Sequence, residues 1–336
     1  MPASLDDSPH FLKNWQQQLA GAFTNIDGLC RYLNLTAADL PTSEAAAKDF
    51  PMRVPLNFAS CIEKGNPHDP LLRQVLPINQ ELLPYPGFTS DPVGDLAASA
   101  QTGLLHKYHG RVLMINTGSC AINCRYCFRR DFPYADLQLS KQAELAAIDH
   151  LQRDTSISEV ILSGGDPLLL SDTRLAQLFK KLIAIKHIKR IRIHSRLPIV
   201  LPARITPEFI DTLQQSGKQI VIVMHCNHAN ELNGRVLAAC HLLSSQPFTL
   251  LNQSVLLKGV NDDAHVLCGL SERLFEFGVL PYYLHLLDRA KGTGHFEVAE
   301  TVALDLHRQM QATLPGYLVP KLVREIAGEK SKSYVT

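Results

Sequence analysis

Short apolar runs rich in β-branched residues alternate with amphipathic helical segments from about residue 110 onward. Six such runs recur at roughly thirty-residue spacing: 112–117, 159–163, 190–195, 219–224, 248–255 and 280–287. Segments with apolar residues at helical spacing lie between them: 173–186, 206–217, 230–240 and 263–278. This alternation predicts βαβ units and a parallel sheet. Because six strands are too few for a closed eight-stranded barrel, we expect an α/β fold with an open, partial barrel.

The segments before the predicted barrel and at the C-terminus lack this alternation of strand and helix patterns. Helical periodicity is present over residues 11–33, whereas residues 78–95 are rich in turn-forming residues. The sequence therefore predicts a mainly helical N-terminal extension over residues 1–100, a barrel over 101–314 and an extended C-terminal segment over 315–336.

Polar residues follow each of the six predicted strands, for example His194–Arg196 after the third and Asp288 after the sixth. Loops are commonly polar, so polar residues after any single strand are weak evidence for a site. Since the carboxyl ends of parallel barrel strands meet on one face, six cases in succession predict a shared cavity there.

Charge and composition exclude several classes of protein. The chain has 33 basic and 32 acidic residues, and this balance gives no signal for a nucleic-acid partner. The N-terminus lacks the pattern of a signal peptide, and no apolar stretch reaches the roughly 18 residues of a membrane span. We therefore expect a cytoplasmic protein without a membrane partner, whose eight cysteines are thiols or metal ligands rather than disulfides.

Three cysteines, Cys120, Cys124 and Cys127, lie within eight residues directly after the first predicted strand. Disulfides need pairs and structural zinc sites nearly always need four ligands. Three thiolates can instead bind three irons of a [4Fe–4S] cluster and leave the fourth iron open. The amine and carboxylate of S-adenosylmethionine could fill that position, and an electron from the cluster could then release a 5′-deoxyadenosyl radical. A zinc site completed by His106 or His109 is the alternative.

A glycine-rich motif follows the second predicted strand, with Ser163, Gly164, Gly165 and Asp166 in succession. Glycine lets the backbone approach a ligand closely, and an aspartate can accept hydrogen bonds from an amine or a ribose hydroxyl. A simple turn would explain the motif equally well, but its place after the next strand favours cofactor binding.

The cysteine motif together with this second motif resembles the radical S-adenosylmethionine superfamily. Further phrases narrow the resemblance to the lysine 2,3-aminomutase family: CRYCFRR, SGGDPL, RIHSRLPIVLPARIT, HCNHANE, LNQSVLLKGVND and PYYLHLLD. Within that family the chain is most similar to the short branch that supplies (R)-β-lysine for elongation factor P. The resemblance covers nearly the whole chain and implies a partial (β/α)6 TIM-like barrel with the cluster loop after its first strand.

The resemblance also implies a second cofactor, pyridoxal 5′-phosphate, carried on a lysine of the tail. Lys332 matches the family position, and Lys330 is the other lysine of that segment. The family's arginine for the substrate carboxylate corresponds to Arg129, and its acidic residues for the substrate ammonium correspond to Asp288 and Glu325.

Two further cofactor contacts are expected. Tyr126 lies inside the cluster loop and is a candidate to flank the adenine of S-adenosylmethionine. Gln253 is a candidate cavity residue. A C-terminal cysteine cluster for zinc, found in some family members, has no counterpart after Cys268.

The implied activity is that of an isomerase that converts L-lysine into (R)-β-lysine by radical chemistry with pyridoxal phosphate. The implied partners are L-lysine, a reductant protein such as flavodoxin or ferredoxin, elongation factor P and its lysylating enzyme. Two alternatives stay open at this point. One is a radical enzyme for another amino acid or a protein, and the other is a non-catalytic metal-binding interaction module.

Overall fold

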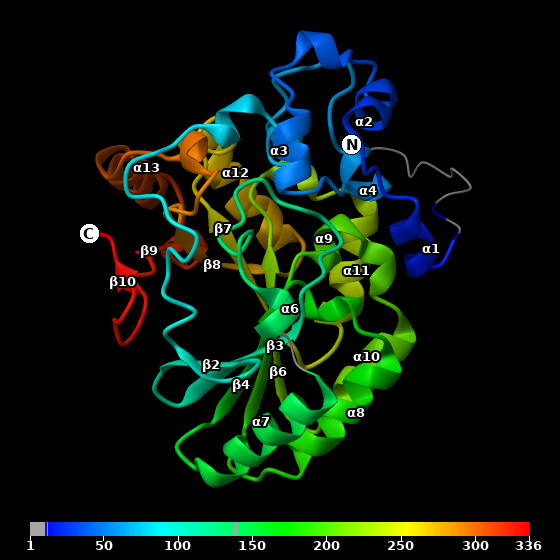
Figure 1. Cartoon of the computed structure of the whole chain (residues 1–336), viewed down its shortest axis with the longest axis vertical. Helices are drawn as coiled ribbons and strands as arrows, with labels where there is room; N and C mark the ends of the chain where they lie inside the picture. Colours follow the sequence, from blue (N-terminus) through cyan, green and yellow to red (C-terminus); the bar gives the residue numbers. More distant parts are fainter. Residues whose placement is uncertain (1–10, 12, 138–139) are drawn as a thin grey trace.

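A ten-stranded sheet forms the centre of the protein, in a computed structural model that describes residues 11, 13–137 and 140–336. Its strands lie side by side in chain order from β1 to β10. The six barrel strands are β3 (Arg111–Thr117), β4 (Glu159–Gly164), β5 (Arg190–Ser195), β6 (Gln219–His225), β7 (Thr249–Val255) and β8 (Leu280–His285). All six pair in parallel, so the predicted α/β partial barrel is confirmed (Figure 1).

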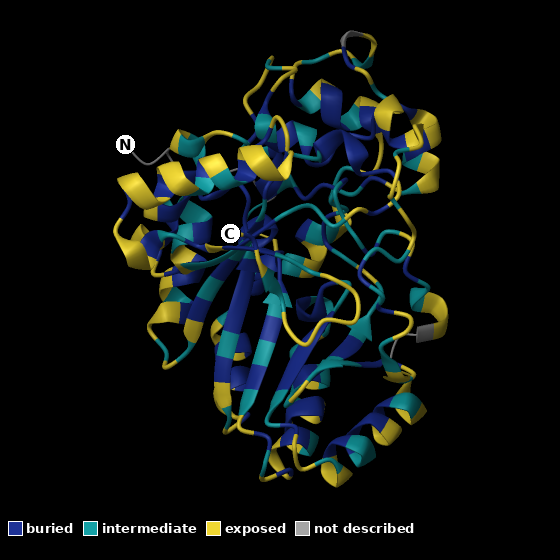
Figure 2. Cartoon of the chain, turned by 90° about the vertical axis from the view of Figure 1, so that its left-hand side faces the viewer, coloured by how far each residue is buried: buried dark blue, intermediate teal, exposed yellow. Residues whose placement is uncertain are grey.

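Helices cover the outer face of these strands. They are α7 (Lys141–Arg153), α8 (Asp172–Ile183), α10 (Pro207–Gln214), α11 (Gly234–Ser244), α12 (Ala264–Glu276) and α13 (Glu300–Thr313). Most begin at a side chain that accepts a hydrogen bond from the first turn, such as Ser171 before α8 and Thr206 before α10. Strand β4 is buried at four successive positions, as expected for a parallel strand covered on both faces (Figure 2).

Short strands that the sequence analysis did not predict extend the sheet at both edges. On one side, β1 (Ser99–Gln101) and β2 (Leu104–Tyr108) pair antiparallel next to β3. On the other side, β9 (Lys321–Arg324) pairs in parallel with β8, and β10 (Ser333–Tyr334) returns antiparallel to β9. These strands have two to five residues, which is too short for a periodic pattern to stand out.

The N-terminal extension contains short helices: α1 (Trp15–Ala20), α2 (Ile26–Tyr32), α3 (Glu44–Asp49), α4 (Leu56–Ala59) and α5 (Pro70–Arg73). The periodic segment 11–33 holds two of them because Asn14 and Asn25 each cap a new helix. Buried residues of this region and of the barrel belong to one continuous apolar cluster. No helix in the described ranges is both long and apolar enough to cross a bilayer.

Candidate active site

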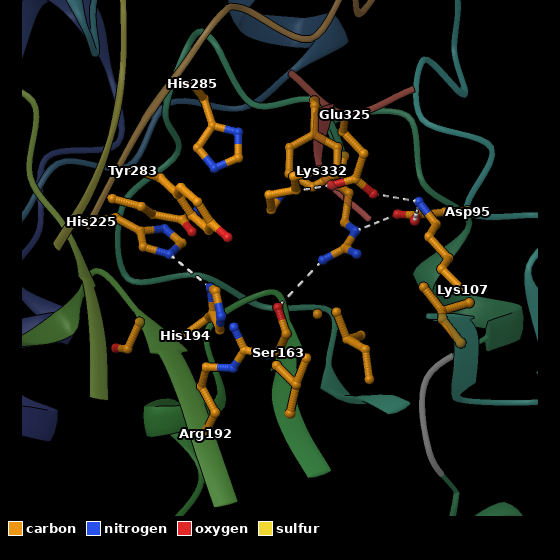
Figure 3. A pocket seen from close by; sticks show the side chains of 18 of the residues that line it. Asp95, Lys107, Ser163, Arg192, His194, His225, Tyr283, His285, Glu325 and Lys332 are labelled. Carbon is orange, nitrogen blue, oxygen red and sulfur yellow. Dashed lines mark hydrogen bonds and ion pairs between the residues drawn. The ribbon is translucent and has the colours of Figure 1, made fainter. Parts of the chain in front are cut away.

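A cavity of about 800 Å³ occupies the inside of the barrel. Its wall includes the three clustered cysteines, the motif 163–166, and residues from β2, β5, β6, β7, β8 and the C-terminal segment. The cavity brings together all thirteen site residues expected from the sequence: Cys120, Cys124, Tyr126, Cys127, Arg129, Ser163, Gly164, Gly165, Asp166, Gln253, Asp288, Glu325 and Lys332. Figure 3 shows part of this wall, with Ser163, Glu325 and Lys332 among the labelled residues.

The cysteine loop follows β3 and presents three free, half-buried thiols to the cavity. Burial raises the pKa of Cys120 well above its usual value and that of Cys127 to about 11. Unliganded thiols in such a place stay protonated at neutral pH, whereas a bound metal would take them as thiolates. The loop therefore gathers three soft ligands without joining any two of them in a disulfide.

Arg125 fastens this loop to the N-terminal extension. Its side chain is fully buried and donates to both carboxylate oxygens of Glu81, at 2.9 and 2.6 Å. It also donates to the backbone carbonyls of Phe50 and Ala46. These contacts hold the cysteine loop against the barrel. We call the part of the extension that makes them, Ala46, Phe50 and Glu81, the collar.

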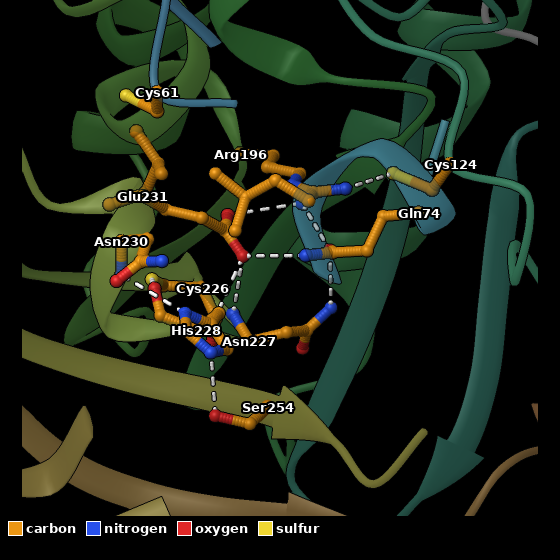
Figure 4. A network of polar contacts seen from close by, with 12 residues as sticks. Cys61, Gln74, Cys124, Arg196, Cys226, Asn227, His228, Asn230, Glu231 and Ser254 are labelled. Atoms are coloured by element: carbon orange, nitrogen blue, oxygen red, sulfur yellow. Dashed lines mark hydrogen bonds and ion pairs between the residues drawn. The ribbon is translucent and has the colours of Figure 1, made fainter. Parts of the chain in front are cut away.

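Arg196, after β5, connects a cluster cysteine to a buried polar network (Figure 4). Its Nη1 lies 2.7 Å from Sγ of Cys124. Its Nη2 donates to Gln74 at 2.7 Å and to Glu231 at 3.0 Å. Burial opposes the charge of Arg196, but neighbouring anionic groups, first Cys124, raise its pKa overall. Arg196 therefore links the sulfur of Cys124 to the carboxylate of Glu231 through one guanidinium.

The two glycines of the 163–166 motif are required by close backbone packing. A Cβ on Gly165 would lie 2.2 Å from the carbonyl oxygen of Ser119 in the cysteine loop. Gly164 has φ of +112° and its added Cβ would lie 2.7 Å from the carbonyl of Thr117. Only glycine at both positions lets the motif pack directly against the cysteine loop.

Asp166 joins the loops after β4 and β5. Its carboxylate accepts hydrogen bonds from the Ser195 hydroxyl and the Arg196 amide, both at 2.8 Å. The amides of Leu168 and Leu197 donate to it as well. Burial raises the pKa of Asp166 to about 6 despite these donors. Both oxygens have protein partners, so Asp166 holds the loops after β4 and β5 together, and its contact with a cofactor stays a prediction.

Arg129 enters the cavity directly after the cysteine loop. Its Nε donates to Asp95 at 2.7 Å, and its Nη1 lies 3.4 Å from the Ser163 hydroxyl. Burial disfavours the charge, but Asp95 outweighs burial and raises the pKa of Arg129. The guanidinium is therefore held in place on one side and can still receive an anion on the other.

A chain of ion pairs continues from Asp95 to the C-terminal segment. Lys107 lies 2.6 Å from Asp95 and 2.9 Å from Glu325, and Lys332 lies 2.8 Å from the other oxygen of Glu325. Burial would raise the pKa of Glu325, but Lys332 and Lys107 lower it to about 2. Glu325 and Lys332 face one another because Arg324 pairs with Ser333 in the β9–β10 hairpin.

The two tail lysines differ clearly in their surroundings. Lys332 is half-buried and lines the cavity, with its Nζ 5.9 Å from the centre of the Tyr283 ring. Lys330 is exposed and does not belong to the cavity wall. Of the two, Lys332 is the one whose amine can reach a cofactor inside the barrel.

Asp288, after β8, lines the cavity as a half-buried carboxylate. Burial, reinforced by the nearby charge of Glu325, raises its pKa to about 7. No ion pair to Asp288 is present within the described residues. It is therefore a site where a cationic ligand group would be stabilised.

The comparisons with known proteins identify the family. Residues 114–266 match the model of the radical SAM superfamily. The chain is 49% identical to the L-lysine 2,3-aminomutase of Escherichia coli over 322 residues, covering 96% of this chain and 94% of that protein. The chain belongs to the L-lysine 2,3-aminomutase family.

Other members span a wide range of similarity. The Haemophilus influenzae L-lysine 2,3-aminomutase is 47% identical, covering 96% of this chain and 95% of that protein. The Clostridium subterminale member is 33% identical, covering 96% of this chain and 77% of that protein. Among solved structures, a radical SAM methyltransferase from Sphaerobacter thermophilus aligns with a TM-score of 0.45 at 16% identity, over 66% of this chain and 68% of that one. We draw no argument from this last likeness.

The residues of this family member fit the cofactors that its family implies. Three thiols on one loop, with Arg196 donating to one of them, suit a cluster that keeps one iron free of protein ligands. At the opposite ends of the strands, Arg111, Arg190 and Arg192 line the same cavity, where Arg190 and Arg192 pair with Glu159 and leave an excess of positive charge for an anionic group such as a phosphate.

Sequence reasoning missed several residues of this site. Asp95 lies in the extension and Lys107 lies in the short strand β2, and no sequence motif marks either residue. His285 and the hydrogen-bonded pair His194 and His225 form a neutral patch inside the barrel, where burial lowers the pKa of each. His194 and His225 stand at strand ends and were visible as polar residues, but only the structure reveals their contact.

The positions of Tyr126 and Gln253 agree with contact to a ligand. Tyr126 packs edge-on against Phe296, and the Arg196 guanidinium lies 5.5 Å from its ring centre. The Oε1 atom of Gln253 is buried and has no hydrogen-bond partner in the described part of the chain. An amide oxygen left in this state is available to a ligand donor.

Proposed function

We propose that this protein is an L-lysine 2,3-aminomutase that makes (R)-β-lysine with a [4Fe–4S] cluster, S-adenosylmethionine and pyridoxal phosphate. The observation that carries the proposal is the single cavity shared by three cysteines, Arg129, Asp288 and Lys332. Family membership supports the reaction, and the cavity supports the substrate.

The cysteines provide the radical source. Cys120, Cys124 and Cys127 would hold the cluster, and the packed 163–166 motif beside them would receive the amino-acid part of S-adenosylmethionine. When bound, these groups supply a 5′-deoxyadenosyl radical that can take a hydrogen atom from an unactivated carbon. The barrel wall orients the substrate carbon toward it and excludes water.

Substrate orientation follows from charges of opposite sign in the cavity wall. Arg129 would bind the α-carboxylate of lysine, held in the correct direction by Asp95. Asp288 would bind the distal ammonium, because it lines the cavity without an ion-pair partner in the described ranges, whereas Asp166 already accepts four hydrogen bonds from the protein. Glu325 adds negative charge nearby but is already shared between Lys107 and Lys332. This arrangement favours a long cationic amino acid over an acidic one.

Lys332 would carry pyridoxal phosphate, and Arg111, Arg190 and Arg192 would receive its phosphate. The matched test compares Lys332→Ala with Lys330→Ala. We expect the yellow absorbance of the bound cofactor to disappear only in Lys332→Ala, since Lys330 is exposed. Equal loss in both variants, or retention in Lys332→Ala, would contradict this assignment.

The decisive experiment is anaerobic incubation of the cluster-loaded protein with L-lysine, S-adenosylmethionine and a reductant, followed by chiral analysis. We expect (R)-β-lysine to accumulate. If lysine stays unrearranged while cluster and pyridoxal phosphate are both loaded, the substrate assignment is wrong. Formation of a β-isomer from another amino acid under the same conditions would favour the alternative radical enzyme.

We further propose that the product serves the modification of elongation factor P, and that flavodoxin or ferredoxin supplies the electron. Both proposals rest on the resemblance to the short family branch. The test adds elongation factor P and its lysylating enzyme to the completed reaction and measures the mass of elongation factor P. No increase in mass, when synthetic (R)-β-lysine gives one, would overturn the proposed use of the product.

A further inference from the structure

A second group of metal-type ligands lies outside the cavity, between β2 and α7. His106 is on β2, His150 is in the last turn of α7, and Asp154 caps the end of that helix. One potential ligand atom from each residue lies within 4.8 Å of the other two. The sequence raised His106 only as a fourth ligand for the cysteines, whereas the fold places it beside another imidazole and a carboxylate.

His150 supplies an independent sign of a missing ligand. Its Nε2 atom is buried and has no hydrogen-bond partner among the residues that the structure describes. The His106 and His150 rings meet edge to face, with centres 6.2 Å apart. Because a buried imidazole nitrogen is normally paired, this atom lacks a partner that a cation or water would provide.

Asp154 is prepared to act as an anionic ligand. The backbone amide and the hydroxyl of Ser156 donate to its Oδ1 at 3.0 and 2.6 Å, which fixes the carboxylate and leaves Oδ2 outside these bonds. Hydrogen-bonded carboxylates of this kind commonly orient metal ligands.

We propose that His106, His150 and Asp154 form a binding site for a divalent transition-metal ion, with zinc the best fit and water as fourth ligand. Two imidazoles and one carboxylate are a common zinc ligand set. Metal–ligand bonds of about 2.0–2.2 Å in a tetrahedron place ligand atoms about 3.3 Å apart. Small side-chain rotations at these three half-buried residues would close the present spacing.

The ion would tie strand β2 to helix α7. Lys107, the next residue on β2, points to the opposite face and bridges Asp95 and Glu325 in the active-site cavity. The metal site would therefore fix the strand that carries Lys107. It is separate from the cysteine cluster, since none of its three ligands lines the cavity.

The test measures zinc binding to the full-length, cluster-loaded protein under anaerobic conditions, by equilibrium dialysis and elemental analysis of zinc and iron together. We expect about one zinc ion per chain without loss of iron. Counting iron in the same samples matters because an empty cysteine loop would itself bind zinc.

Three variants make the assignment specific. His150→Gln and Asp154→Asn each remove a ligand, and both should weaken zinc binding at least tenfold, about the smallest effect of disturbing even an outer contact. His241→Gln, at an exposed histidine of α11, should leave binding unchanged. If His150→Gln does not fold, the zinc affinity of Asp154→Asn alone tests the site, because Asp154 lies at the end of α7.

A second measurement is the melting temperature. Zinc should raise it in the parent protein and in His241→Gln but not in the ligand variants, because a ligand stabilises only the state it binds. Zinc uptake that is equal in parent and ligand variants, or that occurs only as iron is lost, would overturn the proposal.

Discussion

At the scale of single residues, the site depends on groups whose charge is set by their neighbours. Asp288 and Glu325 are both acidic and both line the cavity, yet the pKa of Asp288 is raised to about 7 and that of Glu325 is lowered to about 2. The difference arises because Glu325 contacts two lysines and Asp288 is mainly desolvated. A bound ammonium would therefore change the protonation of Asp288 and leave that of Glu325 unchanged.

The pH dependence of lysine binding tests this difference. An ionised Asp288 attracts the substrate ammonium, so KM for lysine should rise as the pH falls below about 7. Asp288→Asn should raise KM about tenfold or more, because a hydrogen bond to a charged group contributes about 1.5–3 kcal/mol. It should also remove the pH step, which is this rise of KM as the pH falls. Steady-state kinetics across this range measures the step in the parent protein and in both variants. Glu325→Gln should keep the step but move it to lower pH, because the charge of Glu325 helps to raise the pKa of Asp288. An unchanged step in Asp288→Asn would assign it to another group.

Arg196 should tune the cluster. Its positive charge and its contact with Cys124 Sγ favour the reduced cluster, which carries one more electron. Arg196→Gln should therefore lower the reduction potential, while Arg196→Lys, which keeps the charge, should lower it less. Potentiometry followed by electron paramagnetic resonance gives the values. Equal potentials in all three proteins would show that Arg196 only supports the fold.

At the scale of elements, the cysteine loop is held by its neighbours and not by its own sequence. The 163–166 motif packs against it from β4, and the collar of the N-terminal extension grips it through Arg125. The β9–β10 hairpin closes the other side and delivers Glu325 and Lys332. Each of these three elements comes from a different part of the chain.

Weakening the collar should destabilise the protein and loosen the cluster. Glu81→Gln removes a carboxylate that is buried with Arg125 and Arg130, and breaking such a pair typically costs about 3–5 kcal/mol. Arg153→Met removes an exposed pair with Asp149 and should cost less than about 1 kcal/mol. Denaturant unfolding and iron content measure both effects. A Glu81→Gln protein with parental stability and iron content would show that the collar does not hold the cysteine loop in place.

At the scale of the whole molecule, the extension and the barrel share one apolar core. The division into residues 1–100, 101–314 and 315–336 therefore stays a proposal about segments, and we do not expect these segments to fold independently. The active-site cavity needs all three, because the extension contributes Asp95, the barrel the cysteines and the tail Lys332.

Unfolding should accordingly be cooperative across the chain. We expect calorimetry of the cluster-loaded protein to show one transition, because the extension buries its apolar residues against the barrel. Brief proteolysis should not release a folded barrel without its extension. Two separated transitions, or a stable fragment lacking the first hundred residues, would show that the core is divided.

The sequence by itself determined the repeating architecture, the cysteine motif and the family. The six barrel strands and the spacing of Cys120, Cys124 and Cys127 are local patterns, and each is set by residues close together in the chain. Such local patterns carry no information about which distant segments meet, and the tertiary structure supplies it. Only the fold brings Asp95 to Arg129, Arg196 to Cys124 and His106 to His150, because these contacts join distant segments. It also decided between Lys332 and Lys330 as the lysine that reaches the cavity, since strand pairing directs one inward and leaves the other in solvent.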